Sequence, residues 1–167
     1  MSDSNRSLSV RRVDYGDTAD AQALVYLLNA YATDPAGGGE PLSEHAKCNL
    51  AAQLAQRPQA FSLIAWDGGE PIGLINCIEG FSTFACQTLV NVHDVAVLPG
   101  HRGRGVGRLL LAAAEQEAMA RGACKLTLEV LSGNAPARHL YETVGFADYQ
   151  LDPAMGHACF MQKWLKS

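Results

Sequence analysis

The residues best suited to chemistry stand between positions 95 and 108, which read Val-Ala-Val-Leu-Pro-Gly-His-Arg-Gly-Arg-Gly-Val-Gly-Arg. A short apolar strand pattern leads into a turn dense in glycine and arginine, and an amphipathic helix follows. The start of a helix carries unpaired N–H groups and a partial positive charge, so it suits an anion. Glycines let the backbone approach phosphate oxygens closely, and the arginines add charge and forked donors. The pattern therefore predicts a pyrophosphate site.

Two other phosphate signatures do not fit this segment. A Walker A loop needs Lys and Ser or Thr after its last glycine, whereas Gly105 is followed by Val106 and Gly107. A dinucleotide fingerprint needs G-x-G-x-x-G, but the sixth position counted from Gly103 is Arg108. The remaining alternative is a basic helix start that binds no ligand.

Two motifs in register resemble those of one family, the GNAT acetyltransferases. The segment Arg102-x-x-Gly105-x-Gly107 resembles the family signature Q/R-x-x-G-x-G/A. The family's second conserved stretch is resembled by Asn134-x-x-Ala137-x-x-Leu140-Tyr141-x-x-x-Gly145-Phe146. The resemblance covers roughly residues 72–146. It implies an N-acetyltransferase that uses acetyl-CoA as its cosubstrate and transfers the acetyl group to a primary amine.

The resemblance also assigns residues to the cosubstrate. The backbone of Val95, Ala96 and Val97 would hold the pantetheine arm, with the Val95 N–H donating to the thioester carbonyl as it gains negative charge. The pyrophosphate would lie on Arg102, Gly103, Arg104, Gly105, Val106, Gly107 and Arg108. Asn134 would contact the CoA arm or the adenosine side, or only cap its helix, or do both.

The resemblance makes Tyr141 the general acid that protonates the departing CoA thiolate. A phenol suits this task because it is neutral at pH 7 and can still donate a proton. The alternative is a buried helix tyrosine without a catalytic role.

The general base is sought in Asn91-Val92-His93-Asp94, just before the CoA-binding strand segment. Imidazole titrates near neutrality, which favours His93. Asp94 could be the base, orient His93, or pair with a cationic substrate. Both side chains cannot face one pocket in a regular strand, although a bulge would relax that limit. Asn91 carries an amide, which cannot act as a base, and a water chain is a further alternative.

The acceptor pocket is predicted between residues 34–41 and 78–87. Glu79, Phe81 and Phe84 could hold an ammonium group by charge and cation–π contact, or could form a hairpin tip that packs on its own domain. The stretch faintly resembles the polyamine acetyltransferase branch, although His93 replaces an acid there. A protein N-terminus or lysine is an alternative acceptor, and a non-catalytic acyl-CoA sensor is an alternative function.

Composition bounds the remaining expectations. A chain of 167 residues, 18% charged and with a net charge of −4, fits one domain over residues 1–167. The lack of a basic run argues against a nucleic-acid partner, and no apolar stretch is long enough for a bilayer. The five cysteines stand singly, which predicts core positions and neither a disulfide framework nor a metal site. We expect a cytoplasmic protein, and the family resemblance allows a homodimer.

Periodicity and capping residues predict the elements that position these residues. Strands are expected at 8–13, 61–66, 71–78, 89–98 and 125–131, with a closing hairpin at 146–151 and 158–164. Helices are expected after the capping residues Asp17, Ser43 and Asn134, and from about Gly105. The resulting α/β fold has a mixed, twisted sheet of about seven strands with helices on both faces.

Overall fold

The computed structural model describes residues 8–165. These residues form two compact units, which divide after Leu128. The expectation of a single domain over the whole chain stays a prediction.

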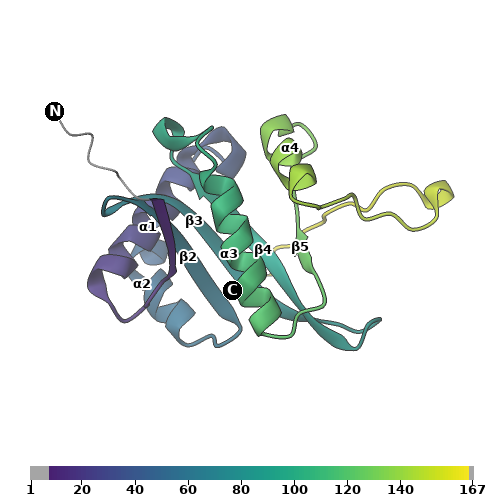
Figure 1. Ribbon diagram of the computed structural model, residues 1–167, viewed down its shortest axis with the longest axis horizontal. Coiled ribbons are helices and arrows are strands. Elements are labelled where there is room, and N and C mark those ends of the chain that lie inside the picture. Colours follow the sequence, from purple (N-terminus) through teal and green to yellow (C-terminus); the bar gives the residue numbers. More distant parts are fainter. Residues whose placement is uncertain (1–7, 166–167) are drawn as a thin grey trace. The chain divides into compact units, whose positions relative to one another are not determined.

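The first unit is built on a five-stranded sheet in the order β1-β2-β3-β4-β5 (Figure 1). Its strands are β1 (Leu8–Arg12), β2 (Ala60–Asp67), β3 (Glu70–Ser82), β4 (Gln87–Val97) and β5 (Leu126–Leu128). Neighbours from β1 to β4 run antiparallel, whereas β5 runs parallel to β4. The predicted mixed sheet is confirmed.

Three helices complete this unit: α1 (Thr18–Thr33), α2 (Glu44–Ala55) and α3 (Val106–Ala120). The predicted caps are found, since the Asp17 side chain accepts from the Asp20 N–H and the Ser43 side chain accepts from the Ala46 N–H. These bonds satisfy donors that the first helical turn leaves unpaired.

The helices cover opposite faces of the sheet. On one face, Ile64 and Leu74 pack in a core cluster with Leu24 and Leu27 of α1. Gly73 is the next residue along β3 and faces the other way, where a Cβ would meet side chains of α3 at 3.1 Å. We refer to these as the α1 face and the α3 face, and Figure 1 shows α3 crossing the sheet.

The second unit differs from the sequence expectation. Its helix α4 (Ala135–Thr143) is capped as predicted, with Asn134 accepting from the Ala137 N–H. The predicted hairpin at 146–151 and 158–164 is wrong, because these residues form no strand and stay largely exposed. A two-stranded hairpin is marginal unless a sheet or helix covers one face, which explains the error. The described sheet therefore has five strands, not about seven.

The cysteine expectation also needs correction. Only Cys77 is buried, and the other four cysteines are exposed. Burial raises the pKa of the Cys77 thiol to about 12, so this thiol stays protonated and unreactive.

An ion pair between Arg11 and Asp20 joins β1 to α1. The guanidinium donates to both carboxylate oxygens, at 2.7 and 2.6 Å, and lies 4.5 Å from the centre of the Trp66 ring. The Asp14 N–H also donates to Asp20, which is only 2% exposed. The Arg11 hydrogen bonds, with a smaller contribution from the Asp14 N–H, lower the pKa of Asp20 below its ordinary value of 3.8.

The variant Asp20→Asn should lower the free energy of unfolding by about 2 kcal/mol at pH 7, less than for a fully buried pair because Arg11 is half exposed. A carboxyl with a lowered folded-state pKa stabilises above its unfolded pKa, and this stability is lost as the pH falls through the folded-state pKa. Denaturant titrations should therefore show the gap between wild type and variant closing below about pH 4. A difference in the free energy of unfolding between wild type and variant that stays constant from pH 7 to pH 3 would contradict this prediction. The exposed pair of Arg138 and Asp148 gives the control Asp148→Asn, with an expected change under about 1 kcal/mol.

Candidate functional site

One extra residue in β4 sets the geometry of the site. The pairing with β3 joins Val92 to Cys77 and Asp94 to Asn76, so His93 has no partner and forms a β-bulge. Cys77 belongs to the α3 face and Asn76 to the α1 face, because they alternate with Gly73 and Leu74 along β3. The bulge therefore turns the Asp94 side chain to the α1 face, where a regular strand would have placed it on the α3 face.

The bulge also sets which backbone groups face the open edge of β4. Before it, the Val90 N–H donates to the Lys125 carbonyl on the β5 side. After it, the Leu98 N–H donates to Ile72 of β3. Since the direction alternates along a strand, the backbone groups of Val95 and Val97 point away from β3.

The edge that they face is open within the first unit. The pairing of β5 with β4 is limited to Val90, Asn91 and Val92, and it ends before the bulge. The backbone of Val95 and the N–H of Val97 are thus placed to pair with an extended ligand as an added strand, whereas the Val97 carbonyl already accepts from Arg102.

The glycine-rich turn joins β4 to α3 in a conformation that needs glycine. Gly103 and Gly105 have φ of 74° and 82°, and Gly105 is the N-cap of α3. A Cβ at either position would meet no heavy atom within 4 Å, so the backbone has open space beside it. The first backbone bond into the helix is donated by the Leu109 N–H to Gly105, so the N–H groups of Val106 and Gly107 have no acceptor within the helix and suit an anion.

Two of the three arginines predicted to bind pyrophosphate are turned toward the protein. Arg102 donates to the Val97 carbonyl at 3.0 Å and to Asp34 at 2.9 Å. The Arg102 hydrogen bond, followed by that of the Ala36 N–H, lowers the pKa of Asp34. These bonds tie the turn to the end of α1 and to the strand that precedes it.

Arg104 makes its contacts on the opposite side of the turn. It pairs with the carboxylate of Asp67 at 3.0 Å and donates to the ring of His101 at 2.9 Å. Asp67 is only 3% exposed, and its other oxygen has no hydrogen-bond partner among the described residues. Arg104 is the nearer partner of the buried Asp67 charge, since the His101 Nδ1 atom lies 3.9 Å from the same carboxylate oxygen, so both arginines shape the turn. Arg108, the third arginine predicted to bind pyrophosphate, is not without an interaction partner either.

Asp94 lies among polar groups on the α1 face. Its Oδ2 atom accepts a hydrogen bond from the Asn76 side chain at 2.9 Å. Burial, and to a smaller extent the charges of Asp94 and Asp34, raise the pKa of Tyr31 on α1, which indicates that this phenol lies near both carboxylates. Tyr31 also lines a small cleft with Val97 and Arg102. Asp94 is therefore near the junction of α1 and the open edge of β4.

The other base candidates differ in their surroundings. His93 is exposed, as expected for the unpaired residue of a bulge. The Asn91 amide donates to the Thr127 hydroxyl at 3.0 Å and joins β4 to β5. Asn91 therefore has a structural partner, and His93 and Asp94 stay the candidates.

The predicted acceptor residues lie elsewhere in the first unit. Glu79 pairs at 3.1 Å with Arg121, the C-cap of α3, and so belongs to the α3 face. Phe81 follows two residues later in β3, and Phe84 lies in the next turn, 97% exposed. The geometry does not bring these residues together with Asp94, so their acceptor role stays an unsupported prediction.

In the second unit, Tyr141 lies on α4 and makes an edge contact with Phe146, the ring centres being 5.9 Å apart. The Phe146 N–H donates to the Tyr141 carbonyl. Asn134 caps the helix, so the structural one of its two predicted roles is observed. The proposed acid role of Tyr141 rests on the motif.

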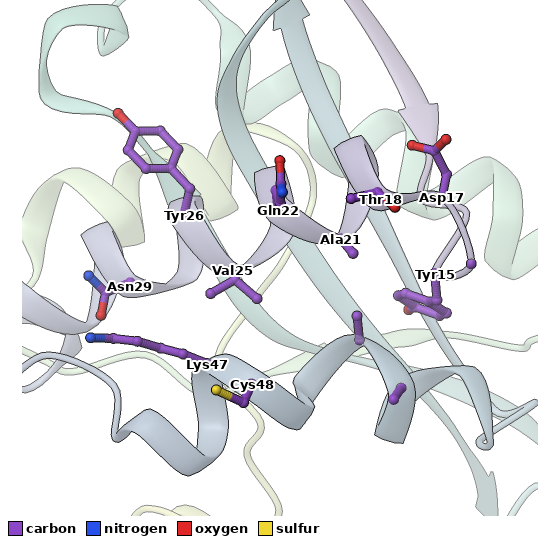
Figure 2. Close-up of a pocket in the computed structure, with 13 residues that line it drawn as sticks. Tyr15, Asp17, Thr18, Ala21, Gln22, Val25, Tyr26, Asn29, Lys47 and Cys48 are labelled. Carbon is purple, nitrogen blue, oxygen red and sulfur yellow. The ribbon is translucent and has the colours of Figure 1, made fainter.

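An open groove of about 700 Å³ lies between α1 and α2 (Figure 2). Asn29 and Val25 of α1 lie on the side of Lys47 and Cys48 of α2, whereas the Tyr26 ring points away from α2. None of the predicted site residues lines this groove. Within residues 8–165, no helix is long and apolar enough to cross a bilayer, and no three acidic, His or Cys side chains gather to share a metal ion.

Sequence reasoning missed five polar residues of the site. Asp34 and Asp67 hold the two arginines, while Tyr15, Ser62 and Asn76 form a hydrogen-bond chain to Asp94. Ser62 and Asn76 interrupt apolar strands, a signal that could have marked them.

The glycine turn and the strand before it lie inside a segment that matches a known family. The family model described as "Acetyltransferase (GNAT) family" matches residues 24–146. An uncharacterized N-acetyltransferase, YhfO of Bacillus subtilis, is 34% identical over 148 residues, covering 85% of this chain and 91% of that protein. Streptothricin acetyltransferase of Streptomyces lavendulae is 48% identical over 87 residues, covering 50% of this chain but only 46% of its own length.

A solved structure shares the fold. The structure of AAC(6')-Iy in complex with the bisubstrate analog CoA-S-monomethyl-acetylneamine matches with a TM-score of 0.74. Sequence identity is 18%, and the match covers 95% of this chain and 99% of that one.

The turn geometry predicts different outcomes for its glycines and arginines. Gly105→Glu should weaken CoA binding at least about 100-fold in calorimetry, because a carboxylate ~4 Å from a phosphate costs several kcal/mol. Gly105→Ala is the matched control, since it has the same backbone strain without the charge. Equal affinities of these two variants would refute the anion site.

Arg104→Ala should instead lower the free energy of unfolding by about 2 kcal/mol, because it removes the guanidinium that lies 3.0 Å from the buried Asp67 carboxylate. The double variant with Asp67→Asn should recover most of that loss. The prediction fails if Arg104→Ala is as stable as wild type in denaturant titrations.

Proposed function

This chain belongs to the GNAT family of acetyltransferases, and we propose that it transfers the acetyl group of acetyl-CoA to a primary amine of a small, cationic molecule. The observation that carries the proposal is the placement of Asp94 beside Val95. The carboxylate of Asp94 lies on the α1 face, and the backbone N–H of the next residue points to the open edge of β4. One strand thus offers an anion for an ammonium group and a donor for a thioester oxygen.

Acetyl-CoA supplies an activated acyl group and a thiol leaving group. The amine, freed of one proton, attacks the carbonyl carbon; a C–N bond forms and the C–S bond breaks. The Val95 N–H donates to the carbonyl oxygen while that oxygen carries negative charge. As the amide forms, the nitrogen loses a second proton, which His93 or water takes, and Tyr141 donates a proton to the departing sulfur. The step balances because the ammonium nitrogen gives up two protons, one proton from Tyr141 reaches the thiolate, and one proton is released overall once Tyr141 is reprotonated.

A small cationic acceptor is favoured by charge. Asp94 and Asp34 both lie near Tyr31, so the junction of α1 and β4 carries two carboxylates, one of them paired with Arg102. Two carboxylates beside one arginine leave a negative charge at this junction, which attracts a cation. The resemblance to streptothricin acetyltransferase over half of this chain supports the same class of acceptor. A protein N-terminus or lysine is the alternative.

The test is thiol release from acetyl-CoA across a panel of polyamines, aminoglycosides, streptothricin, amino acids and short peptides. Turnover with small polyamines or aminoglycosides, and none with peptides, is the expected result. Turnover with peptides alone would replace the small-molecule proposal with a protein acceptor. No turnover with any amine, while CoA binds in calorimetry, would overturn the proposal for all of these classes.

Tyr141→Phe should lower kcat by about 100-fold or more, in the range for loss of a general acid, and leave the affinity for CoA nearly unchanged. The ring and its contact with Phe146 are kept, so the helix should remain folded. Steady-state kinetics and calorimetry measure the two quantities. A kcat equal to that of wild type would remove Tyr141 from the mechanism.

A further inference from the structure

Three polar side chains form a row across the centre of the sheet. Ser62 of β2 lies opposite Asn76 of β3, which lies opposite Asp94 of β4. Directly opposite residues share a face, so all three side chains are on the α1 face. Ser62 is 1% exposed and Asn76 is 8% exposed, so the row is largely buried.

Hydrogen bonds link this row to Tyr15, which precedes α1. The Tyr15 hydroxyl lies 2.9 Å from the Ser62 hydroxyl, which lies 2.6 Å from the Asn76 Oδ1 atom. The Asn76 Nδ2 atom lies 2.9 Å from the Asp94 Oδ2 atom. Four residues from four separate segments are thus joined in one chain.

The chemistry of the groups gives the chain one direction. The Asn76 Oδ1 atom can only accept, so Ser62 donates its single proton there. Ser62 must then accept from Tyr15, and the Asn76 amide donates to Asp94. Burial raises the pKa of Tyr15, so the phenol keeps its proton and remains the first donor. Aligned donors polarise one another and strengthen the bonds.

Burying such a row of polar side chains costs folding free energy, so we expect the row to serve a function. Polar groups buried in a sheet cost free energy that apolar side chains would not, even when they are hydrogen-bonded. A satisfied row does fix one rotamer for each member. Here it ends on the one carboxylate that the bulge turns toward α1, and it occupies only one of the two oxygens of Asp94.

We propose that Tyr15, Ser62 and Asn76 are positioning residues that fix the Asp94 carboxylate so that its second oxygen binds the ammonium group of the acceptor. This inference rests on the proposed function, in which Asp94 receives the amine. It adds specific residues, remote from the cosubstrate, that control acceptor affinity.

The test is Ser62→Ala, which removes the donor to Asn76 and lets that amide turn. With the panel amine that wild type acetylates fastest, the KM for the amine should rise about tenfold, a fraction of the ~100-fold that a 1 Å misplacement can cost. The KM for acetyl-CoA should stay unchanged. Ser62→Thr keeps the hydroxyl and should restore the amine KM.

A matched control is Ser82→Ala at the far end of β3, where the buried hydroxyl only accepts from the Ala85 N–H. It should leave the amine KM unchanged. Tyr15→Phe lies outside the sheet and should give a smaller rise in amine KM, which keeps the test possible if Ser62→Ala is unstable. In an Asp94→Asn background, Ser62→Ala should have no additional effect.

Calorimetric titration of each panel amine into the CoA-bound protein reports acceptor binding without turnover. Absence of turnover in wild type would refute the proposed function. Weaker amine binding in Ser62→Ala would still support the positioning role of the hydrogen bonds that run from Tyr15 to Asp94. The other outcome is that wild type turns over the amine, while Ser62→Ala and Tyr15→Phe keep the wild-type KM for the amine and lose only stability. The hydrogen bonds from Tyr15 to Asp94 are then purely structural, and the inference is wrong.

Discussion

The bulge at His93 is the constraint on which the rest of the site depends. Because side chains and backbone groups both alternate along a strand, one extra residue reverses both at once. After His93, the backbone of Val95 and Val97 faces the open edge, while the side chain of Asp94 faces α1. A regular β4 would send the same backbone groups to β3 and the carboxylate to α3. The site would then lose its N–H donor and its anion together.

The glycine turn shows how charge is used to shape backbone. The motif predicts arginine side chains that bind phosphate, but Arg102 forms an ion pair with Asp34 and Arg104 forms one with Asp67. These pairs hold the turn from two sides, and the space beside Gly103 and Gly105 is open. The proposed anion site would thus be arranged before the ligand arrives, which reduces the ordering cost of binding.

Local features were predictable because local chemistry determines them. Asp17, Ser43 and Asn134 cap the helices that the sequence predicts from them, and the first four strands lie close to their predicted ranges. Features that depend on distant residues were not predictable. The partners of Arg102 and Arg104 lie 68 and 37 positions away. The predicted closing hairpin was wrong because strand-like periodicity does not supply the neighbouring surface that a strand needs.

The two faces of β4 divide the chemistry between backbone and side chains. In the proposed mechanism, the cosubstrate side uses N–H groups and glycines, which any sequence with the right turn and bulge can provide. In the same proposal, the acceptor side uses Asp94 and its row of partners in β2 and β3. Substitutions in that row would alter the affinity for the acceptor amine. They would leave the open edge of β4 unchanged, since the row lies on the α1 face and the edge is formed by backbone groups. Selectivity for the amine is therefore expected to depend on buried side chains of the sheet as well as on the loops around it.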